Sequence, residues 1–177
     1  MTKNKKGFTI IEVVLVLAIA GLIFLMVFIA LPALQRSQRN TRRRQDMSRI
    51  LSSFTDYQSN NGKMPTNSDV NAFIQKYVTA GAKDASGNYQ TNSSSTCVGD
   101  QFCDPDGTPY KLAIQGPFTS SSASGAASEQ PHEIFVYLGA SCDPDTEGKA
   151  IYAKGGSNQI ALLYKLEGGA IYCGDNQ

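Results

Sequence analysis

An uninterrupted apolar run near the N-terminus constrains the fold of this chain more than any other feature. No residue from Val13 to Leu34 is charged. As a helix, the run extends about 33 Å, enough to cross the hydrocarbon core of a membrane. The apolar part of a secretory signal peptide is shorter, about 7–15 residues, and a small-residue cleavage site follows it. We therefore expect a membrane-spanning helix, and the remainder from Gln35 to Gln177 is long enough for one compact domain.

A short basic leader and one carboxylate precede this run. Lys5, Lys6 and Gly7 are followed by Phe8-Thr9-Ile10-Ile11-Glu12. An unpaired carboxylate in an apolar segment costs on the order of a few kcal/mol. The N-terminus of its own helix returns only about 0.3–1 kcal/mol. One interpretation is a plain anchor with Glu12 at headgroup depth; the other is that Glu12 pairs with an ammonium group of a neighbouring copy.

The sequence Gly7-Phe8-Thr9-x-x-Glu12 after a basic leader resembles the prepilin processing motif of type IV pilins and pseudopilins. The resemblance implies cleavage between Gly7 and Phe8 by a prepilin peptidase, which then N-methylates Phe8. Residues 1–7 would be the leader, 8–34 the transmembrane and filament-core helix, and 35–177 an amphipathic helix with an α+β head. Pairing of Glu12 with the Phe8 amine of another copy would support assembly, and Gly21 and Pro32 would weaken the helix.

The same resemblance implies the partners and the location of the chain. The partners would be further copies in a helical filament, the prepilin peptidase/N-methyltransferase, and a pilus assembly platform with its ATPase. The precursor would sit in the cytoplasmic membrane and the product in a cell-surface filament. Five arginines between Arg36 and Arg44 outnumber the three lysines before the span, which by the positive-inside rule favours a cytoplasmic head. We follow the motif instead and interpret these arginines as a solvated helix face towards headgroups or neighbouring subunits.

Beyond Pro32 the helical pattern resumes and predicts one helix from about Phe8 to about Asn60. Its apolar stripe consists of Met47, Ile50, Leu51, Phe54 and Tyr57. Asn60-Asn61-Gly62 and Pro65 end it. A second amphipathic helix is predicted over Val70–Val78, with Asn67 or Ser68 as its N-cap and Gly81 as its end. The stretch from Ala82 to Thr96 has no periodicity and predicts a loop.

The C-terminal third predicts short strands bounded by turn residues: Tyr110–Gln115, Glu133–Gly139, Ala150–Lys154, Gln159–Leu166 and Ala170–Cys173. The segments 155–158 and 167–169 are typical of hairpin connections, and Thr119–Ser128 of a surface loop. The expected fold class is α+β, with a long N-terminal helix packed against a small antiparallel β-sheet head. This order of elements is similar to that of pilins.

The four cysteines, Cys97, Cys103, Cys142 and Cys173, lie in the polar C-terminal part and contain no Cys-x-x-Cys pair. They indicate two disulfides in an oxidising compartment rather than a zinc site. Three pairings are possible. We favour Cys97 with Cys103, which closes a short loop containing Gly99, and Cys142 with Cys173, which ties the last strand to the sheet.

Other chemistry-bearing groups are few. Asp104-Pro105-Asp106-Gly107 predicts a tight turn, similar to one that opens the sheet of many pilins. Asp143, Asp145 and Glu147 resemble half of a calcium loop, but Lys154 stands where a bidentate acid is needed. His132 is interpreted as a surface histidine. The sequence offers no catalytic constellation and no cofactor motif, so it favours a non-enzymatic protein.

The function that the sequence predicts is a structural subunit of a type IV pilus-like filament serving adhesion, motility, DNA uptake or secretion. A minor or competence pilin that touches DNA, or a type II secretion pseudopilin, stays open as an alternative. A membrane-anchored extracytoplasmic enzyme or binding domain is the alternative from another class. No sequence feature supports a catalytic site for it.

Overall fold

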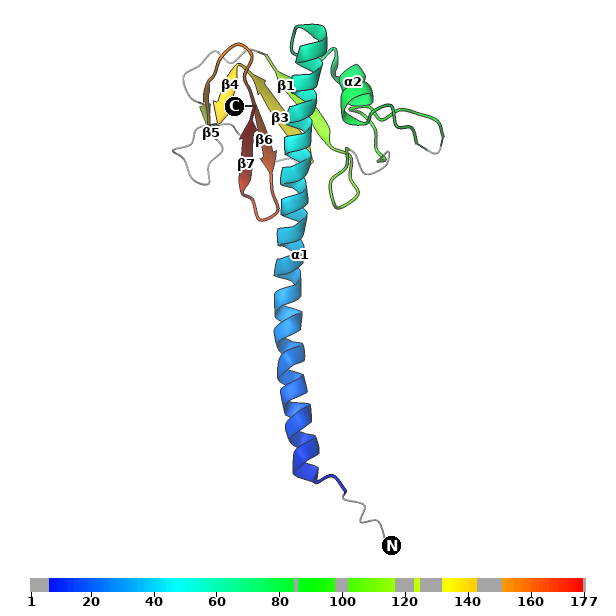
Figure 1. The fold of residues 1–177 in the computed structure, drawn as a ribbon, viewed down its shortest axis with the longest axis vertical. Coiled ribbons are helices and arrows are strands. Elements are labelled where there is room, and N and C mark those ends of the chain that lie inside the picture. The colour runs from blue at the N-terminus through cyan, green and yellow to red at the C-terminus, as the bar shows by residue number, and fades with distance from the viewer. Residues whose placement is uncertain are drawn as a thin grey trace. The chain divides into compact units, whose positions relative to one another are not determined.

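The computed structural model describes residues 7–84, 86–97, 102–116, 123–124, 132–142 and 151–176. The chain forms two compact units, Met1–Gln38 and Arg39–Gln177. Helix α1 (Ile10–Asn61) begins in the first unit and ends in the second (Figure 1). The other elements belong to the second unit: α2 (Val70–Phe73), the π-helical turn η1 (Ile74–Val78), β1 (Lys111–Gln115), β2 (Ala123–Ser124), β3 (Glu133–Leu138), β4 (Ala140–Cys142), β5 (Ile151–Lys154), β6 (Ile160–Lys165) and β7 (Ile171–Asp175).

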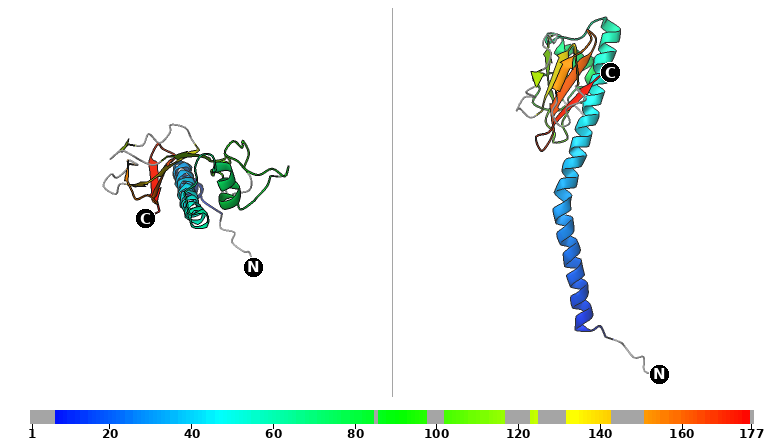
Figure 2. Two further views of the ribbon diagram at one scale, coloured as in Figure 1. Left: turned by 90° about the horizontal axis from the view of Figure 1, so that it is seen from above. Right: turned by 90° about the vertical axis from the view of Figure 1, so that its left-hand side faces the viewer.

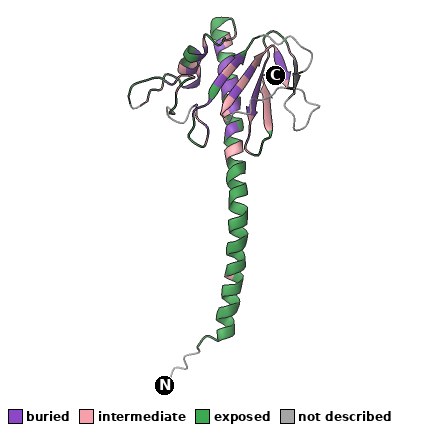
Figure 3. Ribbon diagram, turned by 180° about the vertical axis from the view of Figure 1, so that it is seen from behind, coloured by how far each residue is buried: buried purple, intermediate pink, exposed green. Residues whose placement is uncertain are grey.

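Most of the described part of the first unit is the apolar stretch of α1, and nearly all of its residues are exposed (Figure 3). Its large hydrophobic side chains from Phe8 to Leu34 are between 43% and 89% exposed. One 18-residue window of α1 has a mean hydropathy of 3.2, so this helix is long and apolar enough to cross a membrane. A helix that is hydrophobic on every side requires a non-aqueous surrounding or other helices. This unit therefore fits the predicted anchor.

In the second unit, the rest of α1 lies along the main sheet, as the two views of Figure 2 show. All five stripe residues are buried, which confirms this prediction: Met47, Ile50, Leu51, Phe54 and Tyr57. They meet alternate residues of β1, β3 and β6, such as Ile114, Val136 and Leu162. At Gly174 in β7 a Cβ atom would lie 3.2 Å from Leu51 Cδ1, so glycine allows the helix and strand to approach closely.

The second helix is shorter than predicted. It begins at Val70, with Asp69 rather than Asn67 or Ser68 at the N-cap, and passes into the π-helical turn at Ile74. The Asp69 carboxylate accepts hydrogen bonds from the backbone N–H and the hydroxyl of Thr66. The Phe73 ring lies 4.4 Å from the Phe54 ring, centroid to centroid, so α2 packs on α1. Gly81, with φ of +77°, ends the segment as predicted.

The main sheet has four strands in the order β1-β3-β6-β7. The α+β, pilin-like fold class is confirmed, but the prediction of an antiparallel sheet is wrong at one end. β1 pairs with β3 in parallel, Lys111 opposite Glu133 and Gln115 opposite Tyr137. The remaining pairs, β3–β6 and β6–β7, are antiparallel. A parallel pair needs a long connection, and the stretch of chain between the end of β1 and the start of β3 supplies it.

A second, three-stranded sheet in the order β2-β5-β4 was missed in the sequence. β4 follows β3 after the single residue Gly139, whose φ of +71° turns the chain from one sheet into the other. Residues 155–158 are therefore not a hairpin, because β5 and β6 belong to different sheets. Residues 167–169 do connect the antiparallel pair β6–β7, as predicted. Ala123 and Ser124, expected in a surface loop, pair with β5 instead.

Candidate functional site

The N-terminal site in the first unit is organised by a hydrogen-bonded start to α1. The Glu12 Oε2 atom accepts hydrogen bonds from the Thr9 backbone N–H at 2.8 Å and from the Thr9 hydroxyl at 2.7 Å. Thr9 and Glu12 are three residues apart, the spacing of a capping box, so the polar side chains satisfy orphan groups of the first turn. Both bonds go to one carboxylate oxygen. Within the part of the chain that the structure describes, Oε1 is left for another donor.

Gly7 and Phe8 precede this turn in an irregular segment, and the Phe8 side chain is 89% exposed. Phe8 and Glu12 line one apolar groove together with Val13, Val16 and Leu17. The structure thus places the two predicted assembly residues, Phe8 and Glu12, on one face of the first turns. Cleavage at Gly7–Phe8 stays a prediction.

Gly21 and Pro32, the predicted helix-weakening residues, both lie inside α1. The helix continues through Pro32 although proline removes one backbone donor. The prediction concerns the assembled filament, in which neighbouring helices replace solvent or lipid. It therefore stays a prediction.

A second site, in the head, is a buried charge cluster around Arg43 of α1. Arg43 is only 4% exposed. Its Nε donates to Asp104 Oδ2 at 2.6 Å and its Nη2 donates to Asp104 Oδ1 at 2.7 Å. The Tyr164 hydroxyl donates to the same Oδ2 at 2.7 Å. This bidentate pair joins α1 to the turn before β1 and to β6, with every charge matched.

The electrostatics of the cluster follow from these contacts. Burial alone would raise the pKa of the Asp104 carboxyl, but hydrogen bonds from Arg43, Tyr164 and the Asp106 backbone hold it below its usual range. The hydrogen bond to Asp104 raises the pKa of the Arg43 guanidinium further. Burial raises the pKa of the Tyr164 phenol well above its ordinary value, so this residue stays a donor. The pair is therefore ionised throughout the neutral range.

Arg39 and Glu167 extend the cluster towards the surface. Arg39 Nε and Nη2 donate to the two Glu167 carboxylate oxygens at 2.7 and 2.9 Å, and Arg43 Nη1 lies 2.9 Å from Oε1. The Asn40 side chain accepts from the Glu167 backbone N–H and donates to its carbonyl. The pKa of Glu167 is lowered to about 2, mainly by the hydrogen bonds from Arg39. Glu167 is the first residue of the turn that connects β6 and β7, so this contact fixes the hairpin to the helix.

These contacts correct the interpretation of the arginines as a solvated helix face. Arg42 and Arg44 are exposed, but Arg39 and Arg43 point into the head. A signal for this was present in the sequence. Arg39, Arg43 and Met47 are spaced by four residues, so both arginines extend the apolar stripe towards the N-terminus.

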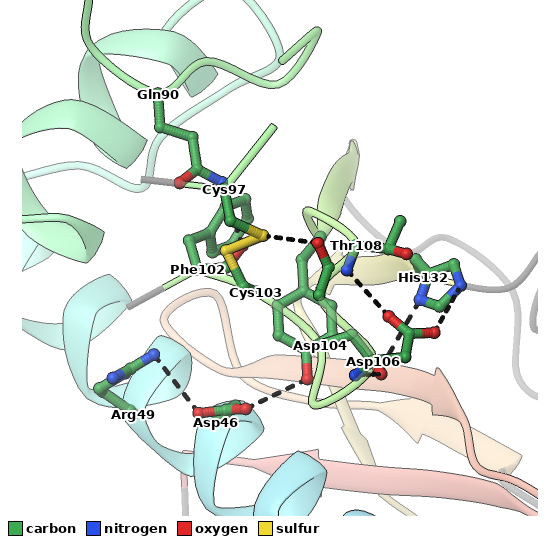
Figure 4. Close-up of a disulfide and its surroundings, with 12 residues drawn as sticks. Asp46, Arg49, Gln90, Cys97, Phe102, Cys103, Asp104, Asp106, Thr108 and His132 are labelled. Carbon is green, nitrogen blue, oxygen red and sulfur yellow. Dashed lines mark hydrogen bonds and ion pairs between the residues drawn. A yellow bond between two sulfur atoms is a disulfide. The ribbon is translucent and has the colours of Figure 1, made fainter. Parts of the chain in front are cut away.

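His132, which the sequence suggested to be a surface histidine, is only partly exposed. It lies directly before β3 with φ of +69° and is largely buried. Its Nδ1 atom is 3.7 Å from Asp104 Oδ2, and its Nε2 atom is 3.4 Å from Asp106 Oδ2 (Figure 4). Each ring nitrogen thus faces one carboxylate of the tight turn. That turn is confirmed, with the Gly107 N–H donating to the Asp104 carbonyl at 2.8 Å.

Asp104, Asp106 and His132 place three possible metal-ligand atoms within 4.8 Å of one another. Asp104 is nevertheless occupied, since four donors and the guanidinium charge of Arg43 already use both of its oxygens. A cation bound here would meet a buried positive charge. We therefore assign the three residues a structural role. The calcium residues that the sequence suggested, Asp143, Asp145 and Glu147, lie outside the described residues.

The structure contains two disulfides, Cys97–Cys103 and Cys142–Cys173, with Cα–Cα distances of 5.8 and 5.9 Å. This is the pairing that the sequence analysis favours. The first disulfide holds the chain next to the Asp104 turn, as Figure 4 shows. The second joins β4 of the small sheet to β7 of the main sheet. One disulfide therefore braces the turn before β1, and the other braces the contact between the two sheets.

Comparison with protein-family models matches residues 2–28 to the prokaryotic N-terminal methylation motif. No curated protein and no solved structure matches the chain significantly. The matched segment contains the basic leader, Gly7, Phe8, Thr9 and Glu12. The chain thus carries a prepilin-type methylation motif, which indicates a type IV pilin-like protein. The motif and the apolar helix together fit a membrane-anchored precursor, and the motif implies processing by a prepilin peptidase.

Proposed function

We propose that the chain is the precursor of a structural subunit of a type IV pilus-like filament. Removal of residues 1–7 creates an α-ammonium group on Phe8, which becomes N-methylated. The apolar part of α1 holds the subunit in the membrane and then forms the filament core. The head of residues 39–177 covers the outside.

The observation that carries this proposal is the arrangement of Glu12 in the first turn of an apolar helix. Thr9 holds the carboxylate through Oε2 alone, which leaves Oε1 for the Phe8 ammonium of a neighbouring copy. An unpaired carboxylate in apolar surroundings costs on the order of a few kcal/mol. Docking of a neighbour relieves that cost on Glu12 and on the ammonium together.

The head supports a structural rather than a catalytic role. Within the described residues, three of the head's perturbed ionisable groups, Arg43, Asp104 and Tyr164, are buried and bonded to one another. Such groups brace a fold and are not presented to a substrate. The filament serves adhesion, motility, DNA uptake or secretion, according to the machinery that assembles it. A minor, competence or secretion-system subunit is the alternative within the same class.

The experiment compares Glu12→Gln with Glu12→Ala in cells that make the protein with its own assembly machinery. A glutamine keeps an oxygen that accepts the Thr9 hydrogen bonds but removes the charge. An alanine removes both. If the carboxylate pairs with a neighbour, both variants insert into the membrane and both lose more than tenfold in sheared-filament yield, since a loss of a few kcal/mol exceeds the free energy of a tenfold change.

Membrane fractionation with an antibody to the head shows that each variant inserts. Thr9→Ala is the matched control, because it keeps the Glu12 charge and the backbone N–H donor and loses only the hydroxyl. Its yield is expected within a few-fold of the unaltered chain. A Glu12→Gln variant that assembles normally while Glu12→Ala does not would mean that Glu12 serves only as a helix cap.

A further inference from the structure

The outer edge of β1 is closed by two side chains from outside the sheet. β1 is the end strand of the main sheet, with β3 on its other side. The Lys111 N–H donates to the His132 carbonyl at 2.9 Å, towards β3. Backbone groups alternate in direction along a strand, so those of Leu112 and Ile114 point away from β3. An end strand of this kind offers a template on which another chain can pair.

Asn92 and Asn67 bind these outward groups. The Leu112 N–H donates to Asn92 Oδ1 at 2.6 Å, and Asn92 Nδ2 donates to the Leu112 carbonyl at 2.8 Å. The Ile114 N–H donates to Asn67 Oδ1 at 3.0 Å. The Asn92 amide therefore makes the same pair of bonds that a residue of a neighbouring strand would make.

The two asparagines, which we call the asparagine pair, are held by their own surroundings. The Asn92 backbone N–H donates to the Asn71 side chain of α2 at 3.0 Å. The Thr91 N–H donates to the Ser94 hydroxyl at 2.9 Å, which makes a compact turn around Asn92. Asn67 lies in the segment that leads into α2. Both residues thus approach β1 from the α2 side of the head.

The opposite edge of the sheet needs no such closure. There β7 is tied to β4 by the Cys142–Cys173 disulfide, and the Cys142 N–H donates to the Asp175 carboxylate at 2.8 Å. β1 has no covalent neighbour of this kind among the described residues. Its side chains offer little protection at the middle of the strand, since Leu112 and Ile114 face the core and only Lys111 carries a charge.

We propose that the asparagine pair closes the β1 edge against strand pairing with β1 of a second copy of this chain. The β1 strands of two copies can pair antiparallel with Ala113 opposite Ala113. Leu112 of one copy then lies opposite Ile114 of the other, and their outward backbone groups can bond to each other. In the monomer, the asparagine pair occupies both of these backbone groups of Leu112 and the N–H of Ile114. Heads that meet at high local concentration consequently contact one another through other surfaces. This inference concerns the head and holds whatever filament the chain forms.

The test uses the full chain in neutral detergent micelles and the variants Asn92→Ala and Asn67→Ala/Asn92→Ala. Light scattering measures association, and hydrogen exchange with mass spectrometry measures the β1 amides. In monomeric Asn92→Ala the Leu112 amide is expected to exchange roughly five- to tenfold faster, because one net hydrogen bond is lost. The double variant is expected to associate at a concentration at least tenfold lower, with residues 111–115 slow to exchange only in the associated fraction.

Two further variants make the result specific. Asn88→Ala lies in the same loop, but among the described residues its side chain bonds to Asp84 and not to β1, so it is expected to behave as the unaltered chain. Asn92→Asp keeps the acceptor for the Leu112 N–H and places a charge at the edge, so it is expected to stay monomeric. The proposal is overturned if exchange at Leu112 is unchanged or if the folded double variant stays monomeric. It is also overturned if Asn92→Asp associates, or if residues 111–115 exchange fast in the associated fraction.

Discussion

The buried pair of Arg43 and Asp104 provides the sharpest test of how the head is held on α1. Removing one partner of a buried ion pair leaves an uncompensated charge and costs roughly 3–5 kcal/mol. The total stability of a domain is only about 5–15 kcal/mol. Arg43→Met keeps the length of the side chain and removes its charge, and it should fall at the lower end because Tyr164 and the Asp106 N–H still serve Asp104. Asp104→Asn should cost about the same, since Glu167 still offsets part of the Arg43 charge.

The double variant is expected to cost at least about 2 kcal/mol less than the sum of the two single variants, because each change removes the charge that the other leaves exposed. Urea unfolding in neutral detergent measures these free energies. The signal is the near-UV circular dichroism of the tyrosines, since the chain has no tryptophan. Arg42→Met is the matched control on the exposed side of α1 and is expected within about 0.5 kcal/mol of the unaltered chain. Two results would refute the view that this pair braces the head. One is that each single variant costs less than about 1 kcal/mol, well below the usual cost of breaking a buried pair; the other is that the two costs are strictly additive.

Three further predictions concern acid, redox conditions and helix geometry. Hydrogen bonds from Arg39 lower the pKa of Glu167 to about 2 from an ordinary 4.5, so Glu167 contributes its full stabilisation of the head above about pH 4.5 and loses it as the pH falls through about 2. Urea titrations at different pH values should show this loss of stability, and Glu167→Gln should reduce the pH dependence. Replacing Cys142 and Cys173 by serine should destabilise the head by up to about 3.7 kcal/mol, the chain-entropy value for a loop of about 32 residues, and expose β7 to proteolysis; unchanged proteolysis would contradict this. In the assembled filament, α1 should bend or unwind between Gly21 and Pro32, and an unbroken straight helix by electron cryo-microscopy would disprove it.

The sequence predicted most of the elements because their signals are local. The apolar run and the stripe of α1 follow from periodicity alone, and the stripe residues are all buried. Short strands next to turns were found in the same way. The sheet order was not accessible, because the parallel pairing of β1 with β3 depends on a connection whose sequence carries no periodic signal. β4 was missed because only one residue separates it from β3.

The charge cluster shows the limit of sequence reasoning at a site. Arg43 and Asp104 are 61 residues apart, and Arg39 and Glu167 are 128 residues apart. A helix with five arginines resembles a solvated face unless the acidic partners are known. The ion pairs of two of these arginines also weaken the charge argument about which side of the membrane the head occupies. In the folded head, Arg39 and Arg43 are neutralised by Glu167 and Asp104, so they are a weaker argument for a cytoplasmic head than the sequence suggested.

The N-terminal site could be described from the sequence, because a processing motif is position-specific and its residues are neighbours in the chain. The sequence singled out Glu12 and, through the family resemblance, the Phe8 amine of another copy as its partner, and that pairing stays a prediction. The structure adds Thr9, which fixes one oxygen of that carboxylate. It also places Glu12 beside Phe8 on one groove. Neither detail requires a contact with a distant part of the chain.

The central claim is that this chain is processed and then built into a filament. Mass spectrometry of the N-terminal peptide from sheared, electron-microscopically verified filaments tests it most directly. The account predicts that the chain is a component of these filaments and begins at Phe8 with one added methyl group, which makes the peptide heavier than its unmodified form by about 14 Da. A filament-borne chain that retains Met1, or one that begins within 18–34, would contradict the claim.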